Sequence, residues 1–117
     1  MASNSSRGAY YKTRSKDWLL KRGYPVADME IVRTNHTPNG VFSTKKDQWG
    51  SDLVYMDALD VVFVQTKGGG KPTATLIKDA EEAFGEVKWA THSRRELHIW
   101  RPRKRAPEVI EWPTQQK

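Results

Sequence analysis

The stretch Asp47 to Gly70, DQWGSDLVYMDALDVVFVQTKGGG, decides the fold, because it holds two apolar runs separated by a short polar segment. Residues 52–56 form the first run, and residues 61–64, mostly β-branched, form the second. Such runs are typical of paired strands. Ala-Leu is a poor centre for a two-residue turn, which favours Asn or Gly, so we predict a four-residue loop, Asp57-Ala58-Leu59-Asp60. The stretch is therefore predicted to be a β-hairpin.

The loop sets the register of this hairpin. Val54 is predicted to face Phe63, and Asp52 to face Gln65, with the Cβ atoms of opposed residues about 4.5–5.5 Å apart. Lys67 lies two residues further along the second strand and therefore on the same face. Three polar side chains are thus expected at one end of an otherwise apolar hairpin.

This polar cluster suits metal-assisted hydrolysis of a phosphodiester. Asp52 would give Mg²⁺ (or Mn²⁺) a hard oxygen ligand, and the side chain of Gln65 and the backbone carbonyl of Thr66 would add two more. Lys67 would stabilise the attacking water or the developing negative charge, and Asp47 is a candidate supporting carboxylate. The alternative is that these polar groups are ordinary solvated strand ends.

Length and composition indicate one domain without disulfides or a thiol-based metal site. The chain has 117 residues and no cysteine, and a chain of this length buries roughly 60–70% of its unfolded surface. We expect a disordered arm over residues 1–7, a domain over 8–112 and a frayed tail over 113–117. No apolar run approaches the roughly 18 residues of a membrane span, and the start lacks a signal-peptide core, so we expect a cytoplasmic protein that does not contact membranes.

The net charge of +6 is concentrated toward the two ends of the chain. Two basic clusters that flank a less charged centre suit a polyanion, and tryptophans and tyrosines accompany them. The alternative is a merely cationic surface. The candidate nucleic-acid contacts are Arg7, Lys12, Arg14, Lys45, Lys46, Arg94, Arg95, Arg101 and Arg103.

Two helices are predicted outside the hairpin. The first runs from residue 8 or 9 to residue 22 and is ended by Gly23. The second runs over residues 73–84, with Thr73 as its N-cap and Gly85 at its end. The three glycines before it, residues 68–70, are predicted to form a flexible elbow, and they lack the Gly-Lys-Ser/Thr sequence of a phosphate-binding P-loop.

The remaining segments are predicted as strands and one long loop. Strands are expected over residues 26–33, 86–91, 96–101 and 107–112, the last at a sheet edge, with Arg94 and Arg95 in a turn between the second and third. Residues 34–46 are predicted to be a loop with a turn at 38–40, placed where substrate contacts could lie. The three histidines show no metal-binding spacing and are interpreted as structural or phosphate-contacting residues.

The order of these segments resembles that of the PD-(D/E)xK nuclease superfamily. The motif occurs as Ser51-Asp52 followed by Gln65-Thr66-Lys67. Within the superfamily the chain is similar to the small archaeal-type and bacteriophage Holliday junction resolvases, through residues 7–11 (RGAYY), the exit of the first helix at Gly23-Tyr24, and residues 47–52 (DQWGSD). The resemblance covers about residues 7–102. It implies an α/β fold with a restriction-endonuclease-like αβββαβ core, that is, a mixed central sheet flanked by helices.

The resemblance also implies roles for individual residues. Asp52 would be a metal ligand, Gln65 would replace the usual acidic ligand, and Lys67 would be the catalytic lysine. Lys12 stands where the first helix of such resolvases often has a glutamate. The implied activity is a Mg²⁺-dependent, structure-selective endonuclease for branched or duplex DNA, working in the cytoplasm, or in the host cytoplasm if the source is a bacteriophage.

Other functions and an assembly follow from the same sequence. One alternative is a non-catalytic nucleic-acid-binding module that kept the fold, and a weaker one is a basic scaffold for an acidic protein. Resolving a four-way junction requires paired nicks, so a symmetric homodimer is expected. Its apolar patch would use Trp89, Trp100, Val109, Ile110 and Trp112.

Overall fold

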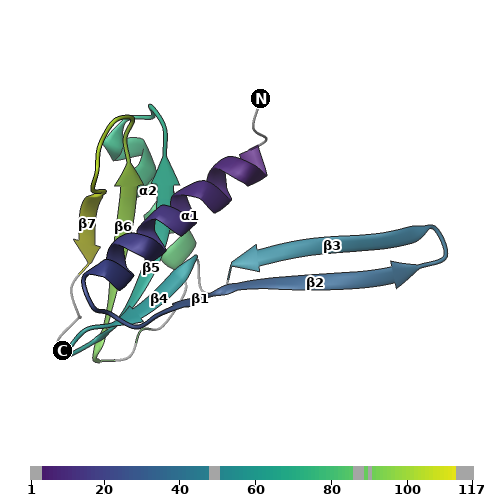
Figure 1. The fold of residues 1–117 in the computed structure, drawn as a ribbon, viewed down its shortest axis with the longest axis horizontal. Coiled ribbons are helices and arrows are strands. Elements are labelled where there is room, and N and C mark those ends of the chain that lie inside the picture. Colours follow the sequence, from purple (N-terminus) through teal and green to yellow (C-terminus); the bar gives the residue numbers. More distant parts are fainter. Residues whose placement is uncertain (1–3, 48–50, 86–88, 90, 113–117) are drawn as a thin grey trace.

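The computed structural model describes residues 4–47, 51–85, 89 and 91–112, and over these the protein is α/β, with a mixed five-stranded sheet and two helices (Figure 1). In chain order the elements are α1 (Asn4–Lys21), β1 (Val26–Asp28), β2 (Glu30–Thr37), β3 (Gly40–Asp47), β4 (Leu53–Met56), β5 (Val61–Gly68), α2 (Thr73–Phe84), β6 (Ser93–Trp100) and β7 (Glu108–Trp112). The large sheet has the strand order β1-β4-β5-β6-β7, and β2 pairs only with β3. Within the large sheet, β5 and β6 are parallel and the other neighbours antiparallel.

The predicted hairpin is confirmed as β4 and β5. Val54 pairs with Phe63, as the four-residue loop required. The loop is held by its first residue, because Asp57 Oδ1 accepts hydrogen bonds from the backbone N–H groups of Leu59 and Asp60, both at 2.8 Å. An aspartate that bonds to the backbone two and three residues on stabilises a tight reversal, which explains why an Ala-Leu centre is tolerated.

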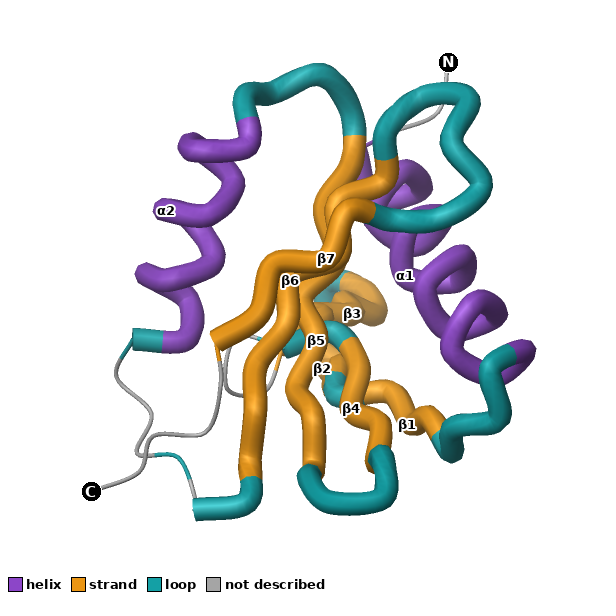
Figure 2. Tube along the Cα trace, turned by 90° about the vertical axis from the view of Figure 1, so that its left-hand side faces the viewer, coloured by secondary structure: helices purple, strands orange, loops and turns teal. Residues whose placement is uncertain are grey.

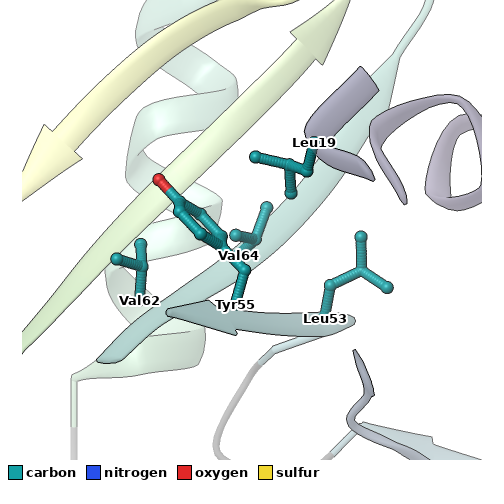
Figure 3. Packing of buried hydrophobic residues seen from close by; sticks show 5 residues of the cluster. All are labelled: Leu19, Leu53, Tyr55, Val62 and Val64. Atoms are coloured by element: carbon teal, nitrogen blue, oxygen red, sulfur yellow. The ribbon is translucent and has the colours of Figure 1, made fainter. Parts of the chain in front are cut away.

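The two helices cover opposite faces of the large sheet (Figure 2). On the α1 face, five buried residues form a core of Leu19, Leu53, Tyr55, Val62 and Val64 (Figure 3). On the α2 face, a second core contains Leu76, Ala80, Phe84, Leu97 and Ile99. A strand buried on both faces reads as a continuous apolar run, as residues 61–64 do.

The segment predicted as a strand followed by a loop is instead a short strand and a long ribbon. The prediction over residues 26–33 splits into β1 and the first part of β2, and the loop predicted over 34–46 is wrong, because this segment continues β2 and forms most of β3. The predicted turn is present: Thr37 pairs with Gly40 across Pro38-Asn39, and Gly40 has a φ of 135°, which favours glycine. Residues 34–46 have no alternation of apolar and polar residues, and for this reason the sequence did not predict the two paired strands.

The strand β6 also differs from its prediction. It begins at Ser93, so Arg94 and Arg95 lie within the strand rather than in a turn. Parallel pairing with β5 starts at Val61 and Ser93, and this extends β6 toward the β4–β5 loop. The strand predicted over residues 86–91 is wrong at Trp89 and Thr91, which are not in a strand; residues 86–88 and 90 lie outside the described part. The predicted edge strand is confirmed as β7.

The predicted helices are confirmed with shifted ends. Helix α1 begins at Asn4, so residues 4–7 of the predicted arm are helical, while residues 1–3 and the predicted tail 113–117 lie outside the described part. Pro72, not Thr73, occupies the N-cap position of α2, without a side-chain cap. Neither helix is long and apolar enough to cross a membrane.

The apolar side chains predicted for a dimer patch are largely used within the chain. Trp100 is 2% exposed and its Nε1–H donates to Ser15 Oγ at 2.7 Å. Trp89 packs on Phe63, and its ring centroid lies 4.9 Å from that of Phe63. Ile110 and Trp112 pack against the α2 core. These residues therefore complete the fold of one chain.

The triple-glycine segment, predicted to be a flexible elbow, is held by hydrogen bonds from Arg101. Arg101 Nη1 donates to the carbonyls of Gly69 at 2.9 Å and Lys71 at 2.6 Å, and Nη2 donates to the hydroxyl of Thr73 at 3.0 Å. Gly69 has a φ of 98°. The guanidinium thus ties the glycine segment to the first residue of α2, because its planar set of donors can reach several acceptors at once.

Gly68 supports the ring of Tyr11, and this contact generates a prediction. A Cβ at position 68 would overlap the Tyr11 ring, whereas one at Gly70 would meet nothing within 4 Å. Gly68→Ala should lower the free energy of unfolding by about 1–3 kcal/mol, the usual range for overpacking, and Gly70→Ala should change it by less than about 0.5 kcal/mol. Urea unfolding of both variants checks this, and Tyr11→Ala should abolish the difference between them.

Candidate active site

The backbone of Asp52 is fixed on both sides at the entry to β4. Its N–H donates to the carbonyl of Val64 at 2.8 Å, and its carbonyl accepts from the N–H of Met29 at 2.9 Å. The β4–β5 ladder begins with Leu53 opposite Val64, and the Asp52 N–H bonds to that same Val64, so the predicted pairing of Asp52 with Gln65 lies beyond the ladder. The sheet therefore holds this carboxylate at a defined position.

The Asp52 carboxylate closes the open edge of β5. Its Oδ2 accepts from the Thr66 N–H at 2.8 Å and from the Thr66 hydroxyl at 2.9 Å. Strand β4 does not extend to Thr66, so the side chain takes the place of a strand partner. The N–H and carbonyl of a residue in an extended strand point to the same side, so the Thr66 carbonyl also lies on this edge. Oδ1 of Asp52 is not used by Thr66.

Gln65 carries the least satisfied polar atom of the cluster. The residue is 6% exposed, and its Oε1 is buried without a hydrogen-bond donor among the described residues. A buried acceptor without a donor costs about 1–3 kcal/mol. A bound cation would satisfy such an oxygen, and the next residue, Thr66, is the one that bonds to the carboxylate of Asp52.

The available ligands are few but chemically suited to Mg²⁺. They are one carboxylate, one amide oxygen and one backbone carbonyl, and within the described part of the chain no three His, Asp or Glu side chains converge. Mg²⁺ prefers oxygen ligands and often binds through one or two carboxylates while keeping several waters. The residues present therefore fit the ion.

Lys67 lies on the same face of β5 as Gln65 and is half-buried. The strand ends at the next residue, Gly68. The structure thus brings Asp52, Gln65, Thr66 and Lys67 to one end of β5. The side chain of Asp47, the fifth candidate, lies outside the described part.

Most of the candidate nucleic-acid contacts that can be placed are engaged within the protein. Arg94 joins the β4–β5 loop, with Nη2 2.6 Å from Asp57 Oδ2 and Nη1 3.2 Å from Asp60 Oδ2. Arg14 lies over the Trp100 ring, 4.2 Å from its centroid, and donates to a backbone carbonyl at 3.0 Å. These arginines act first as structural connectors.

The other candidates divide into engaged, exposed and undescribed residues. Arg95 lies 5.3 Å from the centroid of the Trp89 ring, and Arg101 fastens the glycine segment. Lys12 is half-buried in α1, and Arg103 is exposed between β6 and β7. The side chains of Arg7, Lys45 and Lys46 lie outside the described part.

A buried polar network beneath α1 was not anticipated from the sequence. His98, fully buried, lies between Ser15 and Glu96: its Nδ1 is 3.1 Å from Ser15 Oγ and its Nε2 is 3.0 Å from Glu96 Oε1. The hydroxyl of Tyr55 donates to the same carboxylate at 2.9 Å. These bonds connect α1 with β4 and β6, so His98 is structural, one of the two roles predicted for the histidines.

The pKa of Glu96 reflects this network. Burial alone would raise the pKa, but the hydrogen bond and charge of His98, the hydroxyl of Tyr55 and the charge of Arg94 together hold it below its ordinary value. The pKa of Tyr55 is raised, chiefly by burial and by the charge of Glu96. Glu96 is therefore a buried anion at neutral pH.

The sequence contained a signal for this network. Glu96 and His98 alternate with Leu97 and Ile99, and a strand flanked by helices on both sides buries both sets. Taken alone, such an alternation usually indicates that the polar set faces solvent. Recognising β6 as the parallel partner of β5 would have predicted that these polar side chains are buried.

Comparisons with known proteins bear on the fold alone. No protein-family model matches the chain, and no curated protein matches it. Among solved structures, the chain is similar to the crystal structure of SSO0001, with a TM-score of 0.59 and 13% sequence identity over 99% of this chain. The chain spans 55% of the length of that protein.

The contribution of Glu96 to stability should be lost as the pH is lowered. A lowered pKa means that the stabilisation is complete above the unfolded-state value of about 4.3 and is lost as the pH falls through the native value. Glu96→Gln should therefore be less stable by about 2 kcal/mol at pH 7 and should lose less stability than the wild type between pH 5 and pH 2. Urea unfolding across this range measures both, with the exposed Glu111→Gln as control. If the free energy of unfolding fell equally with pH in the wild type and in Glu96→Gln, the role given to Glu96 would be contradicted.

Gln65 offers a test of the unsatisfied oxygen. Gln65→Met keeps the length of the side chain and removes the buried acceptor, so the free energy of unfolding in EDTA should rise by up to about 1 kcal/mol. Added Mg²⁺ should stabilise the wild type and not the variant. Thermal unfolding with and without Mg²⁺ provides the measurement, and a variant less stable than the wild type in EDTA would show that Oε1 has a donor.

Proposed function

We propose that this protein is a metal-dependent endonuclease that hydrolyses phosphodiester bonds in DNA. The observation that carries the proposal is the buried Oε1 of Gln65, which has no donor in the described part of the chain and belongs to the residue before Thr66, whose N–H donates to the carboxylate of Asp52. A polar group left unsatisfied in this way lowers the stability of the fold, and a bound cation would satisfy it.

The arrangement of elements supports a restriction-endonuclease-like core. Helix α1 precedes three strands that pair antiparallel in the order β1-β4-β5, and α2 then leads to β6, which is parallel to β5. This is the αβββαβ order that the resemblance implied, with the β2–β3 ribbon inserted after the first strand. Function within this core depends on the side chains, not on the fold.

Each residue of the cluster has a role in the proposed reaction. Asp52, Gln65 and the carbonyl of Thr66 would hold Mg²⁺ or Mn²⁺, which when bound supplies charge stabilisation at the scissile phosphate and lowers the pKa of a water. Lys67 would donate a hydrogen bond to the oxygen on which negative charge develops. Thr66 fixes Oδ2 of Asp52, so that the carboxylate is presented in one orientation.

A second candidate follows from the small number of carboxylates. Asp52 is the one carboxylate placed in the cluster, so the second candidate is a module that has the same fold and basic surface and binds DNA without cleaving it.

For the enzyme, we propose branched DNA as the substrate, which would require paired sites in a homodimer. Nicking that depends on a divalent ion separates the enzyme from the binding module.

Asp52→Asn tests the proposal with little structural change. The amide oxygen of asparagine can still accept from Thr66, so the fold should persist, while the loss of the one carboxylate should slow cleavage by about a hundredfold or more. Supercoiled and branched DNA are incubated with Mg²⁺, Mn²⁺ or EDTA, and nicks are counted on gels.

The exposed Asp17 provides the matched control, because Asp17→Asn removes the same charge from α1. It should cleave at the wild-type rate. Wild-type cleavage by Asp52→Asn would remove Asp52 from the site, and absence of metal-dependent nicking by the wild type would favour the binding module.

A further inference from the structure

The ribbon formed by β2 and β3 projects from the body of the protein and gives the molecule its longest dimension, 51 Å (Figure 1). Within the described part of the chain, its two strands contact each other, and no helix or strand of the body packs along them. Residues 36–41, at its tip, are exposed, and Val41 is 61% exposed. An isolated two-stranded ribbon is only marginally stable in water. A bound partner would therefore stabilise the ribbon.

The charge of the ribbon indicates the chemistry of this partner. Residues 31–46 include Arg33, Lys45, Lys46 and one histidine, and no acidic residue. The strands contain two acidic residues, Glu30 and Asp47, which lie opposite each other in the backbone register at the end of the ribbon nearest the body, its root. Residues 31–46 thus carry positive charge alone, in the half of the ribbon nearest the body, because Lys45 faces Val32 and Lys46 faces Ile31; such charge suits a polyanion.

Its dimensions fit a duplex groove. Each strand has eight residues, which at about 3.3 Å per residue gives a length of about 26 Å. The major groove of B-DNA is about 12 Å wide and admits a two-stranded β-ribbon. A ribbon of this length follows about eight base pairs at 3.4 Å each.

The root of the ribbon is joined to the candidate active site. The N–H of Met29, immediately before β2, donates to the carbonyl of Asp52 at 2.9 Å. A duplex held along the ribbon is therefore held at a fixed distance from Asp52.

We propose that the β2–β3 ribbon binds in the major groove of a DNA duplex and positions that duplex relative to Asp52. The inference rests on the proposed action on DNA but not on cleavage. The sequence places the charges that neutralise phosphates, Arg33, Lys45 and Lys46, in the half of the ribbon nearest the body, and the exposed tip lies furthest along the groove. The ribbon thereby sets the distance between a duplex arm and the scissile bond.

The first experiment measures binding to a linear duplex in EDTA, where cleavage is suppressed. Arg33→Gln/Lys45→Gln/Lys46→Gln should lower the slope of log affinity against log salt by up to about 2.7, at about 0.9 for each phosphate that the variant no longer neutralises. The control, Lys21→Gln/Lys71→Gln/Lys78→Gln, removes three exposed charges elsewhere and should leave the slope unchanged. Equal slopes for the wild type and the ribbon variant, or equal reductions in both variants, would overturn the proposal.

The second experiment shortens the ribbon without removing charge. Replacing residues 34–43 by Asn-Gly, a favourable two-residue turn, keeps Arg33, Lys45 and Lys46 and removes about 13 Å of reach, or about four base pairs. Dimethyl sulfate reacts at guanine N7, which lies in the major groove. The wild type should protect about eight base pairs, and the shortened variant about four.

Two results would count against the ribbon as an element that binds in the groove. An unchanged protection pattern in the shortened variant would exclude groove binding. A wild type that is dimeric by light scattering, together with a monomeric shortened variant and unchanged protection, would assign the ribbon to a second copy of the chain. If the shortened variant fails to fold by circular dichroism, the salt slopes decide alone. Ribbon-dependent binding without metal-dependent nicking would keep this inference and reject the proposed cleavage.

Discussion

The strand β5 is hydrogen-bonded on both edges and covered on both faces, and the position of every other element of the large sheet depends on it. Its antiparallel neighbour β4 follows from a local loop, whereas its parallel neighbour β6 requires a crossover, which α2 supplies. Helix α1 then covers the opposite face. The candidate active site lies where β5 extends beyond the end of β4. There the side chain of Asp52, in place of a strand, accepts the hydrogen bond from the Thr66 N–H of β5.

The two buried polar sets on either side of β5 differ in how they are satisfied. On the α1 side, Glu96 accepts hydrogen bonds from Tyr55 and His98 and is a stable anion. At the other set, Gln65 has a buried oxygen without a donor in the described residues. A satisfied network makes the packing specific, while an unsatisfied group stores free energy that a ligand can release. One sheet thus holds one buried polar set whose hydrogen bonds are made and another with an acceptor that no described residue satisfies.

Local chemistry was predictable from the sequence, and non-local pairing was not. Asp57 determines its own loop, and residues 73–84 have the apolar periodicity of a helix, so both elements were predicted correctly. The hairpin also brings Asp52 to the end of β5 that carries Gln65, Thr66 and Lys67, through the hydrogen bonds of Asp52 with Thr66. The role of Arg94 depends on Asp60 in the β4–β5 loop, 34 residues away in the sequence, and no local pattern indicates that contact. The β2–β3 ribbon was missed because residues 34–46 show no apolar alternation that would mark a strand.

The separation of contacts along the chain sets the order in which the structure can form. The Asp52–Thr66 bond joins residues 14 apart, whereas the Ser15–His98 bond joins residues 83 apart. Closing the longer loop costs about 1.6 kcal/mol more in chain entropy. We therefore expect the hairpin to assemble first and α1 to dock after β6 has joined β5, since contacts of large sequence separation form slowly. Helix α1, which precedes the other described elements in the chain, thus docks after strands that follow it in the sequence.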